Sequence, residues 1–255
     1  MKYRIIWWAA ASVIAVWTGA AHADLGLTQL DANIAATKKI ADKEGWQGSV
    51  SLGYLATTGN TNTRSLNGQA LAGYKSGPWQ DVLAFQAIQS SQNGVTSAEN
   101  FDFNGQSDYN LSDKDYLYGT VDYLRDTFSG YQRRTSEILG YGRRLFRSES
   151  QQLDLEFGAG ARQTYNTDDT HSDDFVQRLA LNYLWQFAEK SNLSENLSVI
   201  NGTDNTFTQS VTALTTNLAG SFALSVSYTV KHNTSVLPGL KNTDTTTAIS
   251  LVYTF

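Results

Sequence analysis

The chain closes on "AISLVYTF", residues 248–255, a segment whose side chains alternate in character. Counted back from the end, every second residue is large and apolar: Phe255, Tyr253, Leu251 and Ile249. The residues between them are small or mostly polar. Because successive side chains of a strand point to opposite faces, the segment predicts a strand with one apolar face. Whether this apolar face contacts lipid or a second layer of protein decides the fold.

The same alternation recurs along the chain, at residues 101–111, 153–162, 179–187 and 222–230. Its period is two residues, whereas a helix would repeat every 3.6 residues. Segments rich in glycine, asparagine and aspartate separate these runs at about eleven places, which is typical of turns. The sequence therefore predicts about twelve strands, each long enough for the roughly 9–11 residues that a tilted membrane strand needs.

The predicted connections alternate in length. The even ones are tight, at 76–78, 112–114, 147–149, 189–191 and 219–220, while the odd ones include the longer segments 166–174, 201–205 and 233–244. Outer-membrane barrels have an even strand number, short periplasmic turns and longer external loops. We therefore expect residues 46–255 to form a closed antiparallel transmembrane β-barrel. An exported soluble β-sandwich would also bury one face of each strand, but it explains neither the loop lengths nor the terminal Phe.

The first 23 residues have the pattern of a secretory signal peptide. Lys2 and Arg4 precede an apolar run from Ile5 to Val16, which is too short to span a bilayer, and Ala21-His22-Ala23 fits a cleavage site. A membrane anchor is the alternative. Residues 24–45 have a different composition, with apolar residues near helical spacing, and predict a short periplasmic helix or arm.

Composition excludes several functions. The chain has no cysteine, and its 19 basic residues face 24 acidic ones, so nucleic-acid binding is not expected. Neither a His/Cys metal cluster nor a phosphate-binding loop is present in the sequence, and no cofactor is expected. The mean hydropathy of −0.34 resembles that of a soluble protein, because averaging hides the alternation between strand faces.

Aromatic residues cluster near the predicted periplasmic ends of the strands, where a membrane–water interface favours them. They are Trp46, Tyr74, Trp79, Tyr116, Trp185, Phe187, Phe222 and Phe255. Arg143 is an exception on the apolar face. It predicts either a side chain that reaches the lipid headgroups or a bulge that reverses the register.

The opposite face of the strands defines the barrel interior and carries both signs of charge. The predicted interior network is Asp102, Asp108, Asp122, Arg134, Arg144, Asp154, Glu156, Arg162, Arg178 and Lys231. These charges either select solutes in a polar conduit or brace the wall as a salt-bridge network, and the second interpretation is favoured. Twelve strands lie between a filled barrel and an open pore. Gly140, Gly142, Gly158 and Gly160 leave local room inside or permit curvature.

Two further segments were weighed for chemistry. Asp168, Asp169, Asp173 and Asp174 are weak candidates for binding a divalent cation, which could also bridge lipopolysaccharide phosphates. Beyond the predicted signal peptide, the histidines are His171 and His232, with no nucleophile motif beside either. We therefore expect no enzymatic activity.

Several stretches in the same order resemble a known family. They are "GYLATTGNT" (53–61), "DKDYLYG" (113–119), "RDTFSGYQRR" (125–134), "GYGRRLF" (140–146) and "LEFGAGAR" (155–162). They resemble the YdiY-like salt-induced outer membrane proteins, a domain family of unknown function. The resemblance implies an outer-membrane β-barrel in a Gram-negative bacterium and brings no catalytic residues. Beyond Arg162 the match is chiefly one of pattern.

These observations predict a passive protein of the outer membrane, which supports the envelope or passes small solutes under salt or osmotic stress. The expected partners are outer-membrane lipid, lipopolysaccharide and the barrel assembly machinery, whose recognition signal the terminal Phe255 resembles. The alternative is a surface protein that binds a cation, lipopolysaccharide or another cell through its external loops. A lipid-modifying enzyme is a third, weaker alternative.

Overall fold

The structure is a computed structural model that describes residues 44–57, 63–127, 130–236, 238 and 241–255. The predicted signal peptide (1–23) and nearly all of the predicted arm (24–45) lie outside the described residues. Twelve strands occupy the described part of the chain: β1 Gly45–Thr57, β2 Thr63–Ser76, β3 Trp79–Gln92, β4 Val95–Asn110, β5 Asp115–Asp126, β6 Tyr131–Arg147, β7 Gln151–Asn166, β8 His171–Ala188, β9 Ser191–Asn201, β10 Thr206–Ala219, β11 Phe222–Asn233 and β12 Thr243–Thr254.

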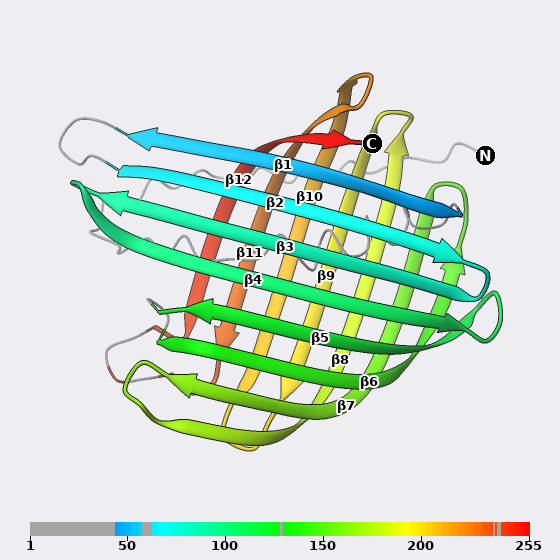
Figure 1. The fold of residues 1–255 in the computed structure, drawn as a ribbon. Helices are drawn as coiled ribbons and strands as arrows, with labels where there is room; N and C mark the ends of the chain where they lie inside the picture. Colours follow the sequence, from blue (N-terminus) through cyan, green and yellow to red (C-terminus); the bar gives the residue numbers. More distant parts are fainter. Residues whose placement is uncertain (1–43, 58–62, 128–129, 237, 239–240) are drawn as a thin grey trace, which may run out of the picture.

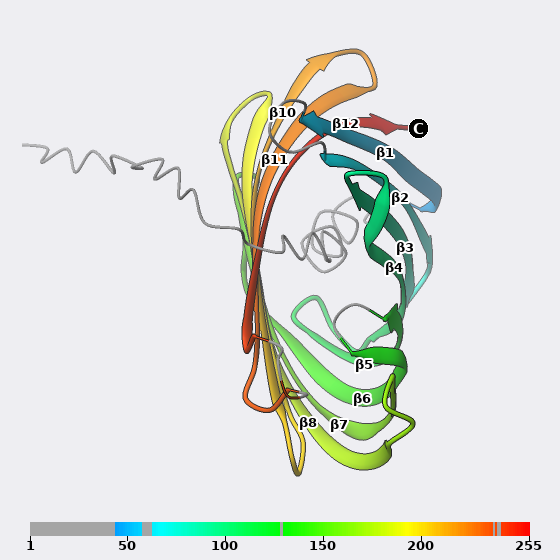
Figure 2. The ribbon, with the colours of Figure 1, turned by 90° about the vertical axis from the view of Figure 1, so that its left-hand side faces the viewer.

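Each strand pairs antiparallel with its neighbour in sequence, and β12 returns to pair with β1. The strands form a ring in Figure 2, and in Figure 1 β1–β4 cross steeply in front of β9–β12. This crossing follows from the tilt that strands need to close into a barrel. The predicted closed barrel of about twelve strands is therefore confirmed, and the alternative of two stacked sheets is wrong. Among the residues described, no helix could cross a membrane.

The two faces of the wall differ as the alternation predicts. Leu155, Val226 and Leu251, which a sandwich would bury, are 37%, 39% and 49% exposed. The residues that alternate with them, such as Ser227 and Ser250, are buried inside the barrel. An apolar outer face with a polar interior is the surface arrangement of a barrel that stands in lipid.

The two ends of the barrel are unlike. At the end that holds Gly45 and Phe255, here called the terminal end, the strands are joined by turns of two to four residues, namely 77–78, 111–114, 148–150, 189–190 and 220–221. The opposite end, here called the loop end, carries connections that range from two residues at 93–94 to nine at 234–242. The segment 166–174 is shorter as a loop than expected, because β7 and β8 pair up to Tyr165 and His171, whose rings stack 5.8 Å apart.

Aromatic rings gather on the outside at the terminal end. The ring centroids of Trp46 and Tyr74 are 4.8 Å apart, and those of Trp79 and Tyr109 are 4.9 Å apart. The ring centroids of Trp185 and Phe187 are 5.6 Å apart, and those of Phe222 and Tyr253 are 5.1 Å apart. The expectation for Tyr116 is wrong, because its side chain points inward and is fully buried. Tyr116 has the same parity on β5 as Tyr118 and Thr120, so its place near the strand end did not put it on the outer face.

Polar groups on the outer face have local partners. Arg143 stays on this face and makes an ion pair of 3.3 Å with Asp115 at the terminal end, and the bulge in β6 follows Arg144. Glu195 of β9 accepts hydrogen bonds from Ser210 (2.7 Å) and Thr212 (2.5 Å) of β10. Such bonds lower the cost of a carboxylate on a surface that faces lipid.

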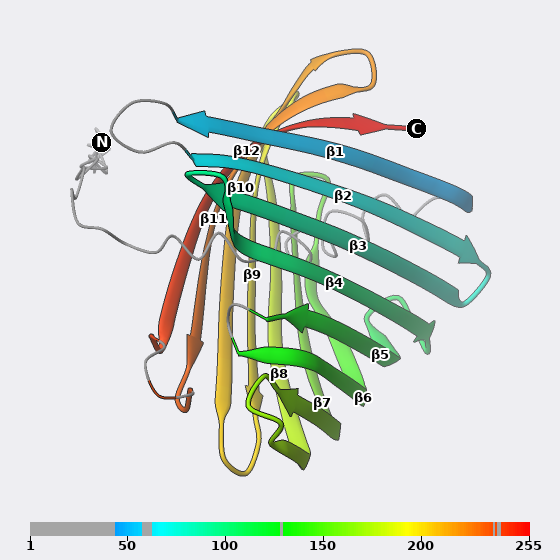
Figure 3. The ribbon, with the colours of Figure 1, turned by 60° about the vertical axis from the view of Figure 1, so that its left-hand side comes forward.

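The seam between β1 and β12 closes the barrel. It has four register pairs, from Ser49–Thr254 to Leu52–Leu251, whereas every other ladder among the described strands has ten or more. Figure 3 shows β12 meeting β1 near the C-terminus. Two further bonds join the last residue to Gly48: Gly48 N–H donates to the Phe255 carbonyl (3.1 Å), and Phe255 N–H donates to the Gly48 carbonyl (2.9 Å). The Phe255 ring covers Gly48, because a Cβ there would lie 2.8 Å from the ring.

Deletion of Phe255 is expected to destabilise the folded barrel, because it removes two backbone hydrogen bonds and a ring contact from the shortest ladder. Each such bond contributes about 1 kcal/mol. The measurement is the temperature at which the refolded protein loses its heat-modifiable band on electrophoresis. Phe187→Ala, which removes a ring of the same belt away from the seam, is the control. An equal decrease of this temperature in the two variants would contradict a special role for the seam.

Candidate functional site

The ten charged residues predicted for the interior all lie on the inner face of the wall. Seven are buried and the other three, Asp102, Asp122 and Arg134, line an internal cavity. They fall into two groups along the barrel axis. Asp108, Arg144, Asp154 and Glu156 lie toward the terminal end, whereas Asp102, Asp122, Arg134, Arg162 and Lys231 lie toward the loop end. Arg178, midway along β8, pairs with Glu156 of the first group and lines the inner cavity together with the second group.

Glu156 is the centre of the group near the terminal end. Its carboxylate makes an ion pair of 2.7 Å with Arg178, and the two side chains are 0% and 9% exposed. The Tyr116 hydroxyl (2.8 Å) and the Gln106 side-chain amide (3.1 Å) also donate to this carboxylate. Arg178 donates in addition to the Tyr118 hydroxyl at 3.3 Å. These residues come from β4, β5, β7 and β8 and form a buried cluster of side chains on this part of the inner wall, here called the plug.

The two tyrosine rings of the plug lie against glycines on β6 and β7. A Cβ on Gly142 would lie 2.1 Å from the Tyr116 ring, and one on Gly140 or Gly158 would lie 2.5 or 2.4 Å from Tyr118. The glycines therefore leave room as expected, but the two tyrosine rings occupy it. On Gly160 a Cβ would lie 1.8 Å from the backbone carbonyl of Glu137, so this glycine serves close approach of two strands.

Apolar side chains extend the plug toward the loop end. Tyr116, Tyr118, Ile138, Val176 and Ile200 form one buried cluster, and Phe207 packs against it. Arg144 lies over the Tyr116 ring at 4.8 Å. The interior between β5 and β10 is thus filled by aromatic and aliphatic groups as well as by charges.

Two neighbouring spaces, which share two lining residues, lie on the loop side of the plug. The inner cavity, of about 60 Å³, is lined by the charged residues of the loop-end group and by Asn104, Thr120 and Ser136. This volume holds only a few water molecules. A vestibule of about 270 Å³ lies at the loop end and is lined by Tyr131, His171, Asp174, Asp204 and neighbouring residues. Arg134 and Arg162 line both spaces and mark the neck between them.

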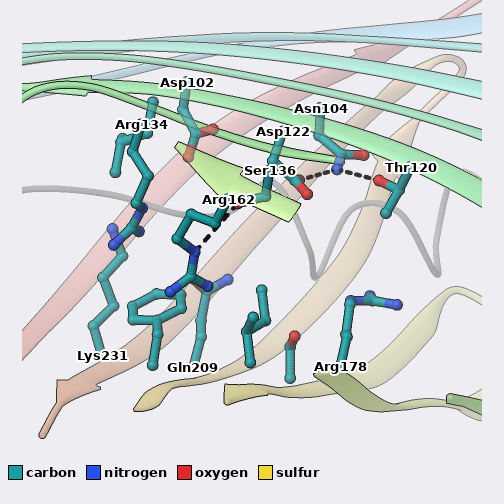
Figure 4. Close-up of a pocket in the computed structure, with 14 residues that line it drawn as sticks. Asp102, Asn104, Thr120, Asp122, Arg134, Ser136, Arg162, Arg178, Gln209 and Lys231 are labelled. Atoms are coloured by element: carbon teal, nitrogen blue, oxygen red, sulfur yellow. Dashed lines mark hydrogen bonds between the residues drawn. The ribbon is translucent and has the colours of Figure 1, made fainter. Parts of the chain in front are cut away.

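Figure 4 shows how side chains from opposite walls face the inner cavity. Asp102, Asn104 and Asp122 come from β4 and β5, while Gln209 and Lys231 come from β10 and β11. The Asn104 amide donates to the Thr120 hydroxyl (3.1 Å) and to the Asp122 carboxylate. Arg162 donates through Nε to the Ser136 hydroxyl at 3.4 Å. The cavity wall is therefore mostly polar by residue, and Leu124, Ile200 and Phe207 are its apolar members.

The acidic residues of the predicted loop are dispersed. Asp168 lies in the turn, where the Thr170 hydroxyl (2.5 Å) and backbone N–H (3.1 Å) donate to its carboxylate and hold its pKa below the usual range. Asp169 has a left-handed backbone, with φ of 64°, and Asp173 is exposed on β8. Asp174 lines the vestibule instead. Within the described residues, no three acidic or histidine side chains form a group that could hold a metal ion.

At the loop end, His171 and His232 each contact a neighbouring side chain. His171 stacks on Tyr165, and the Nδ1 of His232 lies 2.8 Å from the Thr243 hydroxyl.

Four further residues belong to the site although none is among the charged residues predicted for the interior. Tyr116 lies near a strand end, which predicts an outer location, and Tyr118, Gln106 and Ser136 have no charge that distinguishes them. Strict counting of parity along β4, β5 and β6 from the charged residues of the interior network would have placed all four inside, because Asp108, Asp122 and Arg134 share their faces. Which inner residues touch across the barrel depends on tilt and on bulges, which the alternation does not reveal.

A closed barrel of twelve antiparallel strands with an apolar outside and a charged inside defines an outer-membrane β-barrel. Comparison with known proteins agrees. The family model described as "Protein of unknown function, DUF481" matches residues 50–255, and the chain belongs to this family. It is 30% identical to the uncharacterized protein YdiY of Escherichia coli strain K12 over 212 residues, which cover 83% of this chain and 84% of that protein. The resemblance to YdiY-like proteins is confirmed.

Solved structures of similar fold are outer-membrane barrels. The NanC porin is 8% identical, with a TM-score of 0.51 over 81% of this chain and 98% of the porin. An outer membrane channel from Pseudomonas putida F1 is 12% identical, with a TM-score of 0.52 over 84% of this chain and 96% of the channel. At these identities the likeness concerns the fold alone.

Removal of either partner of the Glu156–Arg178 pair is expected to destabilise the barrel more than removal of both. A single Glu156→Leu or Arg178→Leu change leaves a buried charge unpaired, which costs about 3–5 kcal/mol. The double variant removes both charges and should recover part of that loss. Urea unfolding of the refolded protein, followed by tryptophan fluorescence, measures the free energy. Additive losses would show that the two side chains are not coupled.

Gly142→Ala is expected to destabilise the barrel by about 1–3 kcal/mol, since the new methyl group would overlap the Tyr116 ring and the plug would have to shift. Gly68→Ala is the matched control, because a Cβ there meets only Leu52, at 3.6 Å. The same unfolding experiment compares the two variants. An equal effect would mean that the tyrosine does not depend on the missing side chain.

Proposed function

We propose that the protein is a channel of the outer membrane that passes small solutes passively and in a restricted way. The observation that carries the proposal is the pair of polar spaces inside a closed barrel, which share Arg134 and Arg162 and lead inward from the loop end. A lumen lined by polar groups of both signs is the environment that hydrated solutes need to cross a bilayer.

The plug explains why passage would be restricted. Beyond the inner cavity the Glu156–Arg178 pair and the rings of Tyr116 and Tyr118 project into the interior from β5, β7 and β8. A solute that moves inward from the neck would therefore have to pass beside these side chains or displace them. Twelve strands lie between barrels that are filled and barrels that are open, and the side chains of this interior favour a narrow path.

The proposed site of action is the outer membrane of a Gram-negative bacterium. Export would use the signal peptide at residues 1–23, and Phe255 would present the barrel to the assembly machinery. The terminal end would face the periplasm, and the loop end would face outward among lipopolysaccharide molecules. The aromatic belt and the loop lengths support this orientation. A link to salt or osmotic stress is implied by the family resemblance alone and forms no part of the proposal.

The proposed role does not include catalysis. A serine hydrolase needs a base that is oriented by a third group and lies within hydrogen-bond reach of its nucleophile. The contact of His232 with Thr243 and the stacking of His171 on Tyr165 are those of structural loop residues.

Planar-bilayer recording of the refolded protein tests the channel. The wild type is expected to give small, discrete steps that scale with salt concentration. Tyr116→Ala combined with Tyr118→Ala is expected at least to double the step size, because both rings fill the interior beside the glycines of β6 and β7.

Tyr123→Ala provides the control, because it removes a ring from the outer face of the same strand and should leave the steps unchanged. Folding of each variant is checked by heat-modifiable migration. If neither the wild type nor the double tyrosine variant conducts while both are folded, the channel proposal is wrong and a supporting role in the envelope takes its place.

A further inference from the structure

The neck between the two spaces holds two arginines on adjacent strands. Arg134 of β6 pairs in register with Thr164, and Arg162 of β7 pairs with Ser136, so the two arginines are diagonal neighbours on the inner face. We propose that Arg134 and Arg162 together form a binding site for a small oxyanion, a carboxylate or a phosphate, that enters from the loop end. The inference builds on the proposed channel role and names the solute class that its interior would hold.

The contacts of Arg134 leave hydrogen-bond donors unused. Its guanidinium lies over the rings of Tyr131 at 4.6 Å and Phe207 at 4.9 Å. The ring faces stabilise the positive charge but accept no strong hydrogen bond. One terminal nitrogen of Arg134 is buried and has no hydrogen-bond partner. Arg134 lines both spaces, and the planar edge of a guanidinium is the part that binds an anion.

Arg162 is more deeply placed, with 3% of the residue exposed. Its hydrogen bond to Ser136 is long, at 3.4 Å, and uses Nε rather than the terminal nitrogens. Within the part of the chain that the structure describes, neither Arg162 nor Arg134 makes an ion pair, whereas Arg178 has Glu156 at 2.7 Å. Two like charges on adjacent strands repel each other, and an anion between them would relieve the repulsion.

Two nearby carboxylates, those of Asp122 and Asp174, interact electrostatically with Arg162 and also accept hydrogen bonds from other side chains. Asp122, which lines the inner cavity, accepts the hydrogen bond from Asn104. Asp174 stands opposite Arg162 in register and accepts a long hydrogen bond from Ser172, at 3.5 Å. Asp174 and Asp204 line the vestibule together with Arg134 and Arg162. These acids would weaken the hold on an anion, which a conducting pore requires because a bound solute must also leave.

The geometry points to an oxyanion rather than to a halide. The guanidinium group presents a fork of N–H donors that matches two oxygens of one carboxylate or phosphate. The vestibule, of about 270 Å³, admits the body of a small molecule, while the inner cavity, of about 60 Å³, admits little more than its charged group. The ligand would therefore bind with its acid group at the neck and the remainder toward the loops.

Isothermal titration calorimetry of the full refolded chain in a neutral detergent tests the site without requiring conduction. The probes are inorganic phosphate and glucuronate, which separate the two sources of the same chemistry. Saturable binding of at least one probe is expected. Arg134→Gln and Arg162→Gln should each weaken it about tenfold, since a hydrogen bond to a charged group is lost.

Arg143→Gln is the matched control, because this arginine is exposed on the outer face and paired with Asp115. It should bind like the wild type. If the glutamine variants do not refold, Arg134→Lys and Arg162→Lys keep the charge but lose the fork, and they should still weaken binding severalfold. Absence of binding to both probes by the folded wild type, or equal weakening by Arg143→Gln, overturns the site. Binding without conduction would instead refute only the channel.

Discussion

The structure depends on one constraint, which is that hydrocarbon offers no hydrogen bonds to a peptide group. Each strand must therefore find partners on both sides, and the chain meets this requirement by returning β12 to β1. The closure is achieved with a short ladder and with the two bonds between Gly48 and Phe255. Phe255 thus stabilises the closure, because its backbone completes the seam and its ring covers Gly48, which has no side chain. The alternation of apolar and polar residues then follows, because a closed wall has one face in lipid and one face inside.

The alternation is also why the fold could be predicted. A period of two residues, turns of contrasting length and the terminal Phe depend only on local order in the sequence, so the strand number and the closed barrel follow from them. The inner location of the ten charges follows from the same parity.

Tyr116 shows where the prediction fails, because its position near a strand end predicts the outer face whereas its parity predicts the inner one. The length of the 166–174 connection was overestimated because polar, acidic residues were interpreted as a loop, whereas Tyr165 and His171 stack and extend the hairpin. Neither the contacts across the lumen nor the division of the interior into a plug and two spaces could be derived, since both depend on tilt and side-chain volume.

The plug shows how a barrel of intermediate size is filled. Three glycines on β6 and β7 have no side chains where the rings of Tyr116 and Tyr118 lie, so large and missing side chains on neighbouring strands complement each other. The tyrosine hydroxyls then reach the buried Glu156–Arg178 pair and satisfy part of its hydrogen-bonding capacity. A buried ion pair stabilises a protein only when its remaining donors and acceptors are met. The two tyrosine rings therefore fill the space beside the glycines, and their hydroxyls lower the energetic cost of burying the Glu156–Arg178 pair.

The two groups of interior charges differ in how they are neutralised, and this difference separates their roles. Near the terminal end, opposite charges meet at 2.7 Å and are surrounded by hydrogen bonds, which is an arrangement for stability. At the neck, Arg134 and Arg162 stand on adjacent strands against rings and a hydroxyl, and the acids close to them accept hydrogen bonds from Asn104 and Ser172. A charge that is not needed to brace the wall lowers the stability of the barrel unless it interacts with something else. The part of the interior that opens toward the loops holds Arg134, Arg162 and Lys231 beside Asp102, Asp122, Asp174 and Asp204, so its charge is mixed, and the proposed function rests on the two arginines at the neck rather than on the plug.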